Sequence, residues 1–270
     1  MSYKSLIIAI TEVSLDRAAI NQAAALAARF DAHLTGLYVY EPPYYRYPLA
    51  YPNIADVDPE AASGRDEATL AAREAFEAAC RAEGVETNEW RFVRGETLNT
   101  LALHARYADA LVMSGGDLAA RLAIVSSRPV IAVPEADRDR RLGQRIMLAW
   151  NASRESTRAA TAALPLMARA EQVCVLVIDP DGSAHRRLGD NPGADIALYL
   201  ARHGIEAEVR LADSDSVGVA DTLLTEAIEM NADLICMGVY GHSRLRELVL
   251  GGVTRDVIDA PPPLPLLLAH

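Results

Sequence analysis

The sequence predicts an α/β protein built from two tandem domains, each with an open parallel sheet. Apolar runs of strand length alternate along the chain with helical segments of ten or more residues, a pattern typical of βαβ units. The pattern of the first half recurs, in diverged form, from residue 144 onward. With 270 residues, the chain is long enough for two such units, each burying its own core.

Each half is expected to begin with a strand and an alanine-rich helix. The apolar runs Lys4–Ile10 and Gln144–Trp150 are the first strands. Ser14 and Ser153 directly precede the two helices, and a serine hydroxyl at that position accepts a hydrogen bond from the first helical turn. Both serines are therefore predicted N-caps.

The remaining elements also come in matching pairs. The second helix of each half ends near a glycine, Gly84 or Gly204, where a C-cap is expected. The charged segment Glu135–Gly143 is the predicted linker between a first domain of residues 1–135 and a second of residues 144–270. The paired strands expected in chain order are His33–Glu41 and Gln172–Asp179, Glu89–Val93 and Ala207–Leu211, Ala108–Met113 and Ala232–Met237, and Pro129–Val133 and Pro265–Ala269.

Composition narrows the possible partners. The net charge of −11 opposes binding to a nucleic-acid backbone or an anionic membrane, so neither is expected as a partner. No apolar run is long enough to cross a bilayer, and the N-terminal residues do not form a convincing signal peptide. The three cysteines lie far apart among apolar or alanine-rich neighbours: Cys80, Cys174 and Cys236. We expect buried, inert thiols and a cytoplasmic location.

The most informative segment for function is the glycine run that begins at Gly238. Gly238 and Gly241 are separated by two residues, nine residues follow, and then come Gly251 and Gly252. The run comes directly after the predicted strand Ala232–Met237, and ligands of open α/β sheets bind beyond the carboxyl ends of the strands. Glycines there allow backbone N–H groups to approach a ligand, and a helix N-terminus favours phosphate. The alternative interpretation is structural, with the glycines serving only a strand-to-helix turn.

The first half differs at the corresponding place. After Met113 the chain reads Ser114–Asp117, and the stretch from there to Pro129 is about ten residues shorter than its counterpart. It has no equivalent of Gly251 and Gly252. We therefore expect the first site to be degenerate.

Together these residues give the chain a resemblance to universal stress proteins of the tandem type, strong over residues 144–270 and weak over residues 1–134. The family's nucleotide motif is Gly, two residues, Gly, nine residues and Gly, which Gly238, Gly241 and Gly251 match. The resemblance implies a Rossmann-like, adenine-nucleotide alpha hydrolase-like fold and a site for ATP, ADP or AMP, which Mg²⁺ could accompany. The phosphates are expected over Gly241, His242, Gly251, Gly252, Val253 and Thr254, and the ribose and adenine beside Met237, Gly238, Ala149, Trp150, Asn151 and Val177.

Two residues depart from the family pattern. Asn151 stands near the position where the family usually has an aspartate, and an amide offers adenine or ribose a different set of donors and acceptors. Gly252 stands where a hydroxyl residue usually follows the third glycine, although Thr254 could partly replace that donor. Moderate affinity is expected.

The function that follows from the resemblance is a stress-response sensor, a binding module rather than an enzyme. The two domains are expected to pair with each other, and two chains could associate as a homodimer. One alternative is a slow ATPase or phosphotransferase, for which Asp179 is the acidic candidate. Another is a structural or chaperone-like protein that binds no nucleotide. No catalytic residue is predicted, and the histidines show no metal-ligand spacing.

Some individual residues and one segment are interpreted separately. Trp150 either stacks on adenine or packs in the core. Asp109 and Asp233, each just before an apolar strand, are expected to cap or terminate the preceding element. The tyrosine- and proline-rich segment Glu41–Ala61 is either a contact surface for a partner or a loop folded over its own domain.

Overall fold

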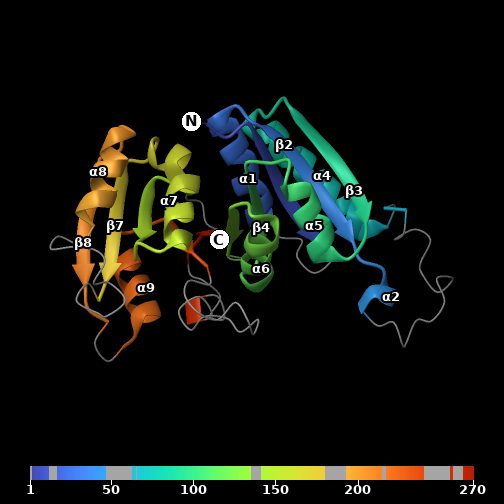
Figure 1. Cartoon of the computed structure of the whole chain (residues 1–270). Helices are drawn as coiled ribbons and strands as arrows, with labels where there is room; N and C mark the ends of the chain where they lie inside the picture. Colours follow the sequence, from blue (N-terminus) through green and yellow to red (C-terminus); the bar gives the residue numbers. More distant parts are fainter. Residues whose placement is uncertain are drawn as a thin grey trace.

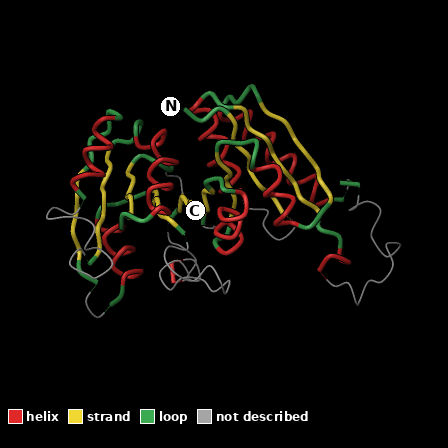
Figure 2. Tube along the Cα trace, viewed as in Figure 1, coloured by secondary structure: helices red, strands yellow, loops and turns green. Residues whose placement is uncertain are grey.

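A single ten-stranded sheet runs through the whole molecule (Figures 1 and 2). The computed structural model describes residues 2–11, 17–46, 63–64, 66–134, 141–179, 193–214, 217–239, 256–257 and 264–270. The strands of the first half are β1 (Ser5–Thr11), β2 (His33–Tyr40), β3 (Asn88–Arg94), β4 (Ala110–Ser114) and β5 (Val130–Val133). Those of the second are β6 (Arg145–Ala149), β7 (Gln172–Ile178), β8 (Glu208–Ala212), β9 (Leu234–Gly238) and β10 (Leu266–Ala269). Every predicted strand is present.

The strand order, β3-β2-β1-β4-β5-β10-β9-β6-β7-β8, repeats in reverse across the middle of the sheet. Neighbouring strands are parallel within each half. The exception is the central pair, in which β10 runs antiparallel to β5. The predicted α/β class with two tandem parallel units is thus confirmed, and the two units are joined edge to edge.

Helices cover both faces of the sheet. They are α1 (Arg17–Phe30), α2 (Pro43–Arg46), α4 (Glu67–Glu83), α5 (Thr97–Ala105), α6 (Asp117–Ser126), α7 (Arg154–Met167), α8 (Ala194–Arg202) and α9 (Val219–Glu229). Side chains of α1, α4, α7 and α8 share one hydrophobic core with the sheet, and those of α5, α6 and α9 share the other. Both cores contain residues of both halves. The cores therefore continue across the junction.

The predicted caps at Ser153 and Gly84 are confirmed, whereas the C-cap of α8 is His203 and Gly204 is the residue after it. Ser153 is the N-cap of α7, and its Oγ accepts a hydrogen bond of 3.1 Å from the Ser156 N–H. Gly84 ends α4 at φ 70°, and Gly204 follows α8 at φ 75°, in the left-handed region that glycine adopts without strain. Ser14 lies outside the described residues.

Two arginines close the junction on the side of α1 and α7. Arg29 donates to the carbonyl oxygen of Arg169 at 2.6 Å, and Arg169 donates to the carbonyl oxygen of Arg29. The guanidinium of Arg169 also lies 4.4 Å from the centre of the Phe30 ring. Because each arginine follows the first strand of its half by the same interval, this reciprocal pair reflects the internal repeat.

Asp109 and Asp233 do something other than the predicted capping of the preceding element. Asp233 is buried, and its carboxylate accepts hydrogen bonds of 2.7–3.1 Å from the N–H groups of Gly143, Gln144 and Arg145 at the start of β6. Asp109 accepts in the same way from Lys4 and Ser5 at the start of β1, at 2.6 and 3.0 Å. Each aspartate lies just before a neighbouring strand, and its hydrogen bonds fix the start of the first strand of its half.

The remaining expectations concern the cysteines, membrane-spanning helices, the linker and the segment Glu41–Ala61. Cys80, Cys174 and Cys236 are free and buried, as predicted. None of the described helices is long and apolar enough to cross a membrane. Most of the linker and of the segment Glu41–Ala61 lies outside the described residues, so the two interpretations of that segment stay open.

Candidate functional site

The candidate site lies where β6 and β9 end side by side. β6 is flanked by β9 and β7, and Leu148 pairs with Cys236 shortly before both strands end. From β6 the chain proceeds outward to β7 and β8, whereas from β9 it proceeds inward to β10. This reversal is the topological switch point, where open α/β sheets form a crevice for ligands.

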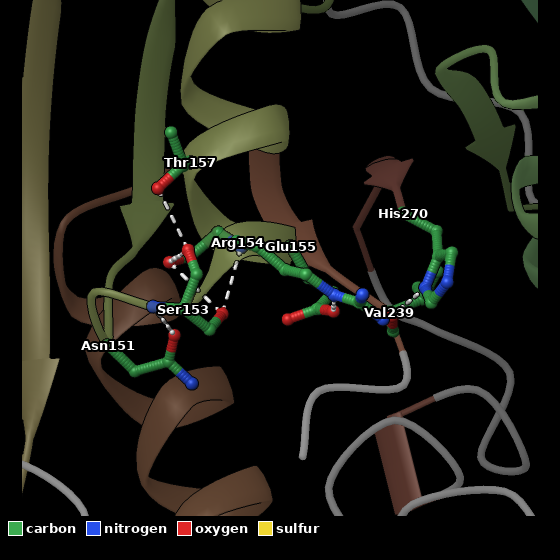
Figure 3. A network of polar contacts seen from close by, with 8 residues as sticks. Asn151, Ser153, Arg154, Glu155, Thr157, Val239 and His270 are labelled. Carbon is green, nitrogen blue, oxygen red and sulfur yellow. Dashed lines mark hydrogen bonds and ion pairs between the residues drawn. The ribbon is translucent and has the colours of Figure 1, made fainter. Parts of the chain in front are cut away.

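The residues that follow β6 carry the accessible part of the site. Ala149 and Trp150 are half-buried, and the Trp150 ring packs against the core that α7 covers. Asn151 is exposed, and its Oδ1 accepts a hydrogen bond of 3.1 Å from the Ser153 N–H (Figure 3). The structure thus shows the packing of Trp150 against the core, and its stacking on adenine stays a prediction.

The first turn of α7 contains several hydrogen bonds between its own residues (Figure 3). Besides the cap by Ser153, the Ser156 and Thr157 hydroxyls donate to the Ser153 carbonyl oxygen at 3.0 and 2.8 Å. The Glu155 side chain also lies in this first turn. A carboxylate there provides the negative charge that a helix N-terminus favours. The carboxylate of Glu155 therefore disfavours a second negative charge, such as a phosphate, at the start of α7.

Glu155 is a buried carboxylate that the sequence interpretation missed. It is 3% exposed and accepts a hydrogen bond from Nε of Arg154, with which it forms an ion pair. Burial raises the pKa of the Glu155 carboxyl, but hydrogen bonds from Arg154 and from its own backbone N–H, with the charge of Arg154, hold the pKa below its usual value. The available signal was an acidic residue two positions after an N-cap serine.

Gly238 ends β9 in close contact with this same turn of α7. A Cβ at Gly238 would lie 2.5 Å from the Glu155 carbonyl carbon and 2.6 Å from the Ser156 nitrogen. Packing of α7 against the end of β9 therefore requires a glycine at position 238. For this position the glycine has a structural role. Met237 beside it is buried at 4% exposure, so ligand contact at this pair would involve the backbone.

Val239 and His270 link the end of β9 to the end of β10. Val239 is fully buried, and its N–H donates to the Ala269 carbonyl oxygen at 2.9 Å. Nδ1 of His270 lies 3.0 Å from the Val239 carbonyl oxygen (Figure 3). Because a carbonyl oxygen only accepts, this contact requires the proton on Nδ1. No local sequence motif predicts this contact, because Val239 and His270 lie on different strand ends.

The end of β7 adds one buried residue and one carboxylate. The Val177 side chain is fully buried in the core that α7 and α8 cover, which leaves only its backbone for a ligand. Asp179 accepts hydrogen bonds of 2.7 Å from both the N–H and the hydroxyl of Ser214. The carboxylate therefore ties the end of β7 to the segment after β8.

The predicted phosphate-binding residues lie outside the described residues: Gly241, His242, Gly251, Gly252, Val253 and Thr254. Among the residues that the structure describes, no group of three or more His, Cys, Asp or Glu side chains could hold a metal ion.

The first half has a different arrangement at the equivalent edge. β4 ends at the buried Ser114, Gly115 follows at φ 84°, and α6 starts at Asp117. No side chain caps the start of α6, and the carboxylate of Asp117 lies in its first turn.

The comparisons with known proteins agree with this architecture. A family model described as the universal stress protein family matches residues 2–125 and again residues 143–264. No curated protein matches the chain.

Three solved structures share the fold over nearly the whole length of the chain. A universal stress protein from Archaeoglobus fulgidus DSM 4304 has 17% sequence identity and a TM-score of 0.70, with 98% of each chain covered. The functionally unknown protein PA1789 from Pseudomonas aeruginosa PAO1 has 15% identity and a TM-score of 0.64, covering 99% of this chain and 92% of its own. A putative universal stress protein from Pseudomonas aeruginosa UCBPP-PA14 has 16% identity and a TM-score of 0.62, covering 99% and 93%. With its two family matches, the chain belongs to the universal stress protein family and carries two of that family's domains in tandem.

Proposed function

We propose that the second half binds ATP or a related adenine nucleotide at the carboxyl ends of β6 and β9, and that the protein acts as a nucleotide-responsive regulatory module. The observation that carries the proposal is the position of the glycine run. Gly238 ends β9 beside β6 at the switch point, and the Gly241–Gly251 spacing continues directly from there. The base and ribose would lie near Trp150, which is half-buried, and Asn151, which is exposed.

The state of α7 supports assigning the phosphates to the glycine segment. The first turn of α7 already holds Ser153 and the buried carboxylate of Glu155, so it offers little to a phosphate. In this proposal the backbone N–H groups of Gly241, Gly251 and Gly252 take that role, with Val253, Thr254 and His242 beside them. Mg²⁺, if bound, would be held chiefly by the phosphates themselves.

Calorimetry with ATP, ADP and AMP on the purified chain tests the proposal. We expect one nucleotide per chain and loss of binding in Gly251→Val, because a branched side chain obstructs close approach of the backbone to a phosphate. The matched control is Gly116→Ala in the first half, where φ is −107° and alanine is tolerated. Two nucleotides per chain would show that the first half also binds. Unchanged binding in Gly251→Val would remove the glycine segment from the site.

The contacts of Asp179 bear on the alternative of a slow ATPase. Both carboxylate oxygens accept hydrogen bonds from Ser214, which gives Asp179 a structural task. We expect ATP turnover no higher than background, and no difference between wild type and Asp179→Asn. Turnover abolished in Asp179→Asn with nucleotide binding retained would instead assign catalysis to this carboxylate.

A further inference from the structure

A groove of about 570 Å³ lies between the two halves, apart from the residues assigned to the nucleotide. One wall is the outward side of α7, and the opposite wall contains the first residues of the chain and the turn between α6 and β5. The end of β10 closes it. Its volume falls within the range of pockets that hold small organic ligands, and it is far larger than the voids left by ordinary packing.

The internal repeat allows the groove to be compared with the equivalent place beside α1. On the opposite side of the junction, the end of the linker packs against α1. Leu142 is buried there, its N–H donates to Oε1 of Gln22 at 3.3 Å, and Arg29 donates to the carbonyl oxygens of Leu142 and Gly143. Among the residues that the structure describes, no segment packs against α7 in the way that Leu142 and Gly143 pack against α1. Tyr3 crosses the groove instead and donates to the Ala162 carbonyl oxygen at 2.7 Å.

The groove combines apolar surface with cationic side chains. Tyr3, Pro129, Ala162 and Pro165 provide the apolar part. Arg158 is exposed and makes no hydrogen bond or ion pair within the described ranges.

Arg128 and Asp109 complete the electrostatics of the lining. Arg128 uses one N–H on the carbonyl oxygen of Arg106, at 2.9 Å, which leaves most of its five donors. Among the described residues of the lining, Asp109 is the one acidic side chain, and its carboxylate accepts hydrogen bonds from the N–H groups of Lys4 and Ser5. The charged side chains named here are therefore two arginines and one aspartate, on a chain whose net charge is −11.

We propose that this groove binds a small organic oxyanion, with the anionic group on Arg128 and Arg158 and an apolar body against Tyr3, Ala162 and Pro165. A planar guanidinium can offer two parallel N–H donors to a carboxylate or a phosphate, which makes arginine well suited to either group. The apolar floor selects ligands that carry a hydrocarbon or aromatic portion over simple inorganic ions. The site does not depend on the proposed nucleotide function.

Calorimetry with phenyl phosphate and phenylacetate as probes tests the site, with phenol and inorganic phosphate as the separated parts. We expect saturable binding of one or both probes, tighter than either part alone. The double substitution Arg128→Gln/Arg158→Gln should weaken binding by about ten-fold or more, because charged hydrogen bonds are lost. Thr161→Trp, on the exposed side of α7 that lines the groove, should also reduce binding.

Two controls keep the outcome specific. Arg202→Gln removes an exposed arginine at the end of α8, away from the groove, and should leave binding unchanged. Gly251→Val should also leave it unchanged, since the glycine segment takes no part. Loss in Gly251→Val with retention in the double variant would assign the probes to the glycine segment and overturn the groove site. Absence of saturable binding, or equal weakening in Arg202→Gln, would overturn it as well.

Discussion

At the scale of single residues, Gly238 shows how one position can serve packing and still border a ligand edge. The contact that excludes a side chain comes from the backbone of α7, so there is no flexible group that could move aside. Its counterpart in the repeat is Ser114, which ends β4 and carries a buried side chain. The first half therefore accommodates a Cβ at this position, and the second half does not.

Gly238→Ala should lower the free energy of unfolding by about 1–3 kcal/mol, the usual effect of forcing extra atoms into a packed site. Urea denaturation measured by circular dichroism provides the check. The matched control, Ser114→Ala, removes atoms rather than adding them and should cost about 1 kcal/mol or less. Equal stability of Gly238→Ala and wild type would contradict the close contact.

The buried thiols make stability depend on alkaline pH. Burial raises the pKa of Cys80 and of Cys174 from 9.0 to about 11. In the unfolded chain the thiols ionise near their ordinary pKa, so the native state retains protons that the unfolded state has lost. Their stabilising contribution is therefore complete below about pH 9 and declines as the pH rises toward 11, by up to about 1.4 kcal/mol per pH unit for each thiol.

Denaturation midpoints measured from pH 8 to pH 10.5 should thus fall with pH in the wild type. The double variant Cys80→Ala/Cys174→Ala should start from lower stability but fall less steeply, because it lacks the two raised pKa values. Parallel slopes for the two proteins would show that these thiols are not responsible.

At the scale of elements, local sequence signals were sufficient to predict the strands and the caps at Ser153 and Gly84, but the N-caps Asp66 of α4 and Glu96 of α5 were missed. The serine before α7 and the glycines after α4 and α8 act through bonds to their own neighbours, so their roles can be read from the chain. The contacts of Gly238 with Glu155 and of Val239 with His270 join segments far apart in sequence. Such contacts depend on tertiary placement, and for that reason a local pattern did not reveal them.

The roles of Asp109 and Asp233 could not be predicted from local sequence either, because their hydrogen-bond partners lie at the start of the neighbouring strand. Asp233→Ala should destabilise the protein by about 2–4 kcal/mol, because several backbone donors at the start of β6 lose a charged acceptor. Asp109→Ala should cost less, about 1–2 kcal/mol, since it holds fewer bonds and is only half-buried. Urea titrations of both variants test this order, and a larger loss in Asp109→Ala would contradict it.

At the scale of the whole molecule, the central β5–β10 pair turns two repeats into one sheet. The pairs Leu266 with Ala132, Leu267 with Ile131 and Leu268 with Val130 are all fully buried. In Figure 1, β3 of the first half and β7 and β8 of the second run toward the same side of the molecule, so the ligand edges of the halves share that side. The accumulated twist of a long sheet produces this arrangement despite the antiparallel centre.

A sheet and two cores that continue across the junction should hold the halves together without the linker. We expect that a chain carrying an engineered protease site at residues 135–140 elutes as one complex after cleavage and unfolds in a single calorimetric transition. Leu267→Arg places a charge in the middle of the β5–β10 contact, where burial is unfavourable, and should cause the cleaved halves to separate or aggregate. The matched substitution Leu198→Arg, at a leucine that is 52% exposed on α8, should leave the complex intact. Separate elution of the cleaved wild-type halves would contradict the continuous sheet, because strands paired this way bury apolar side chains that neither half covers alone.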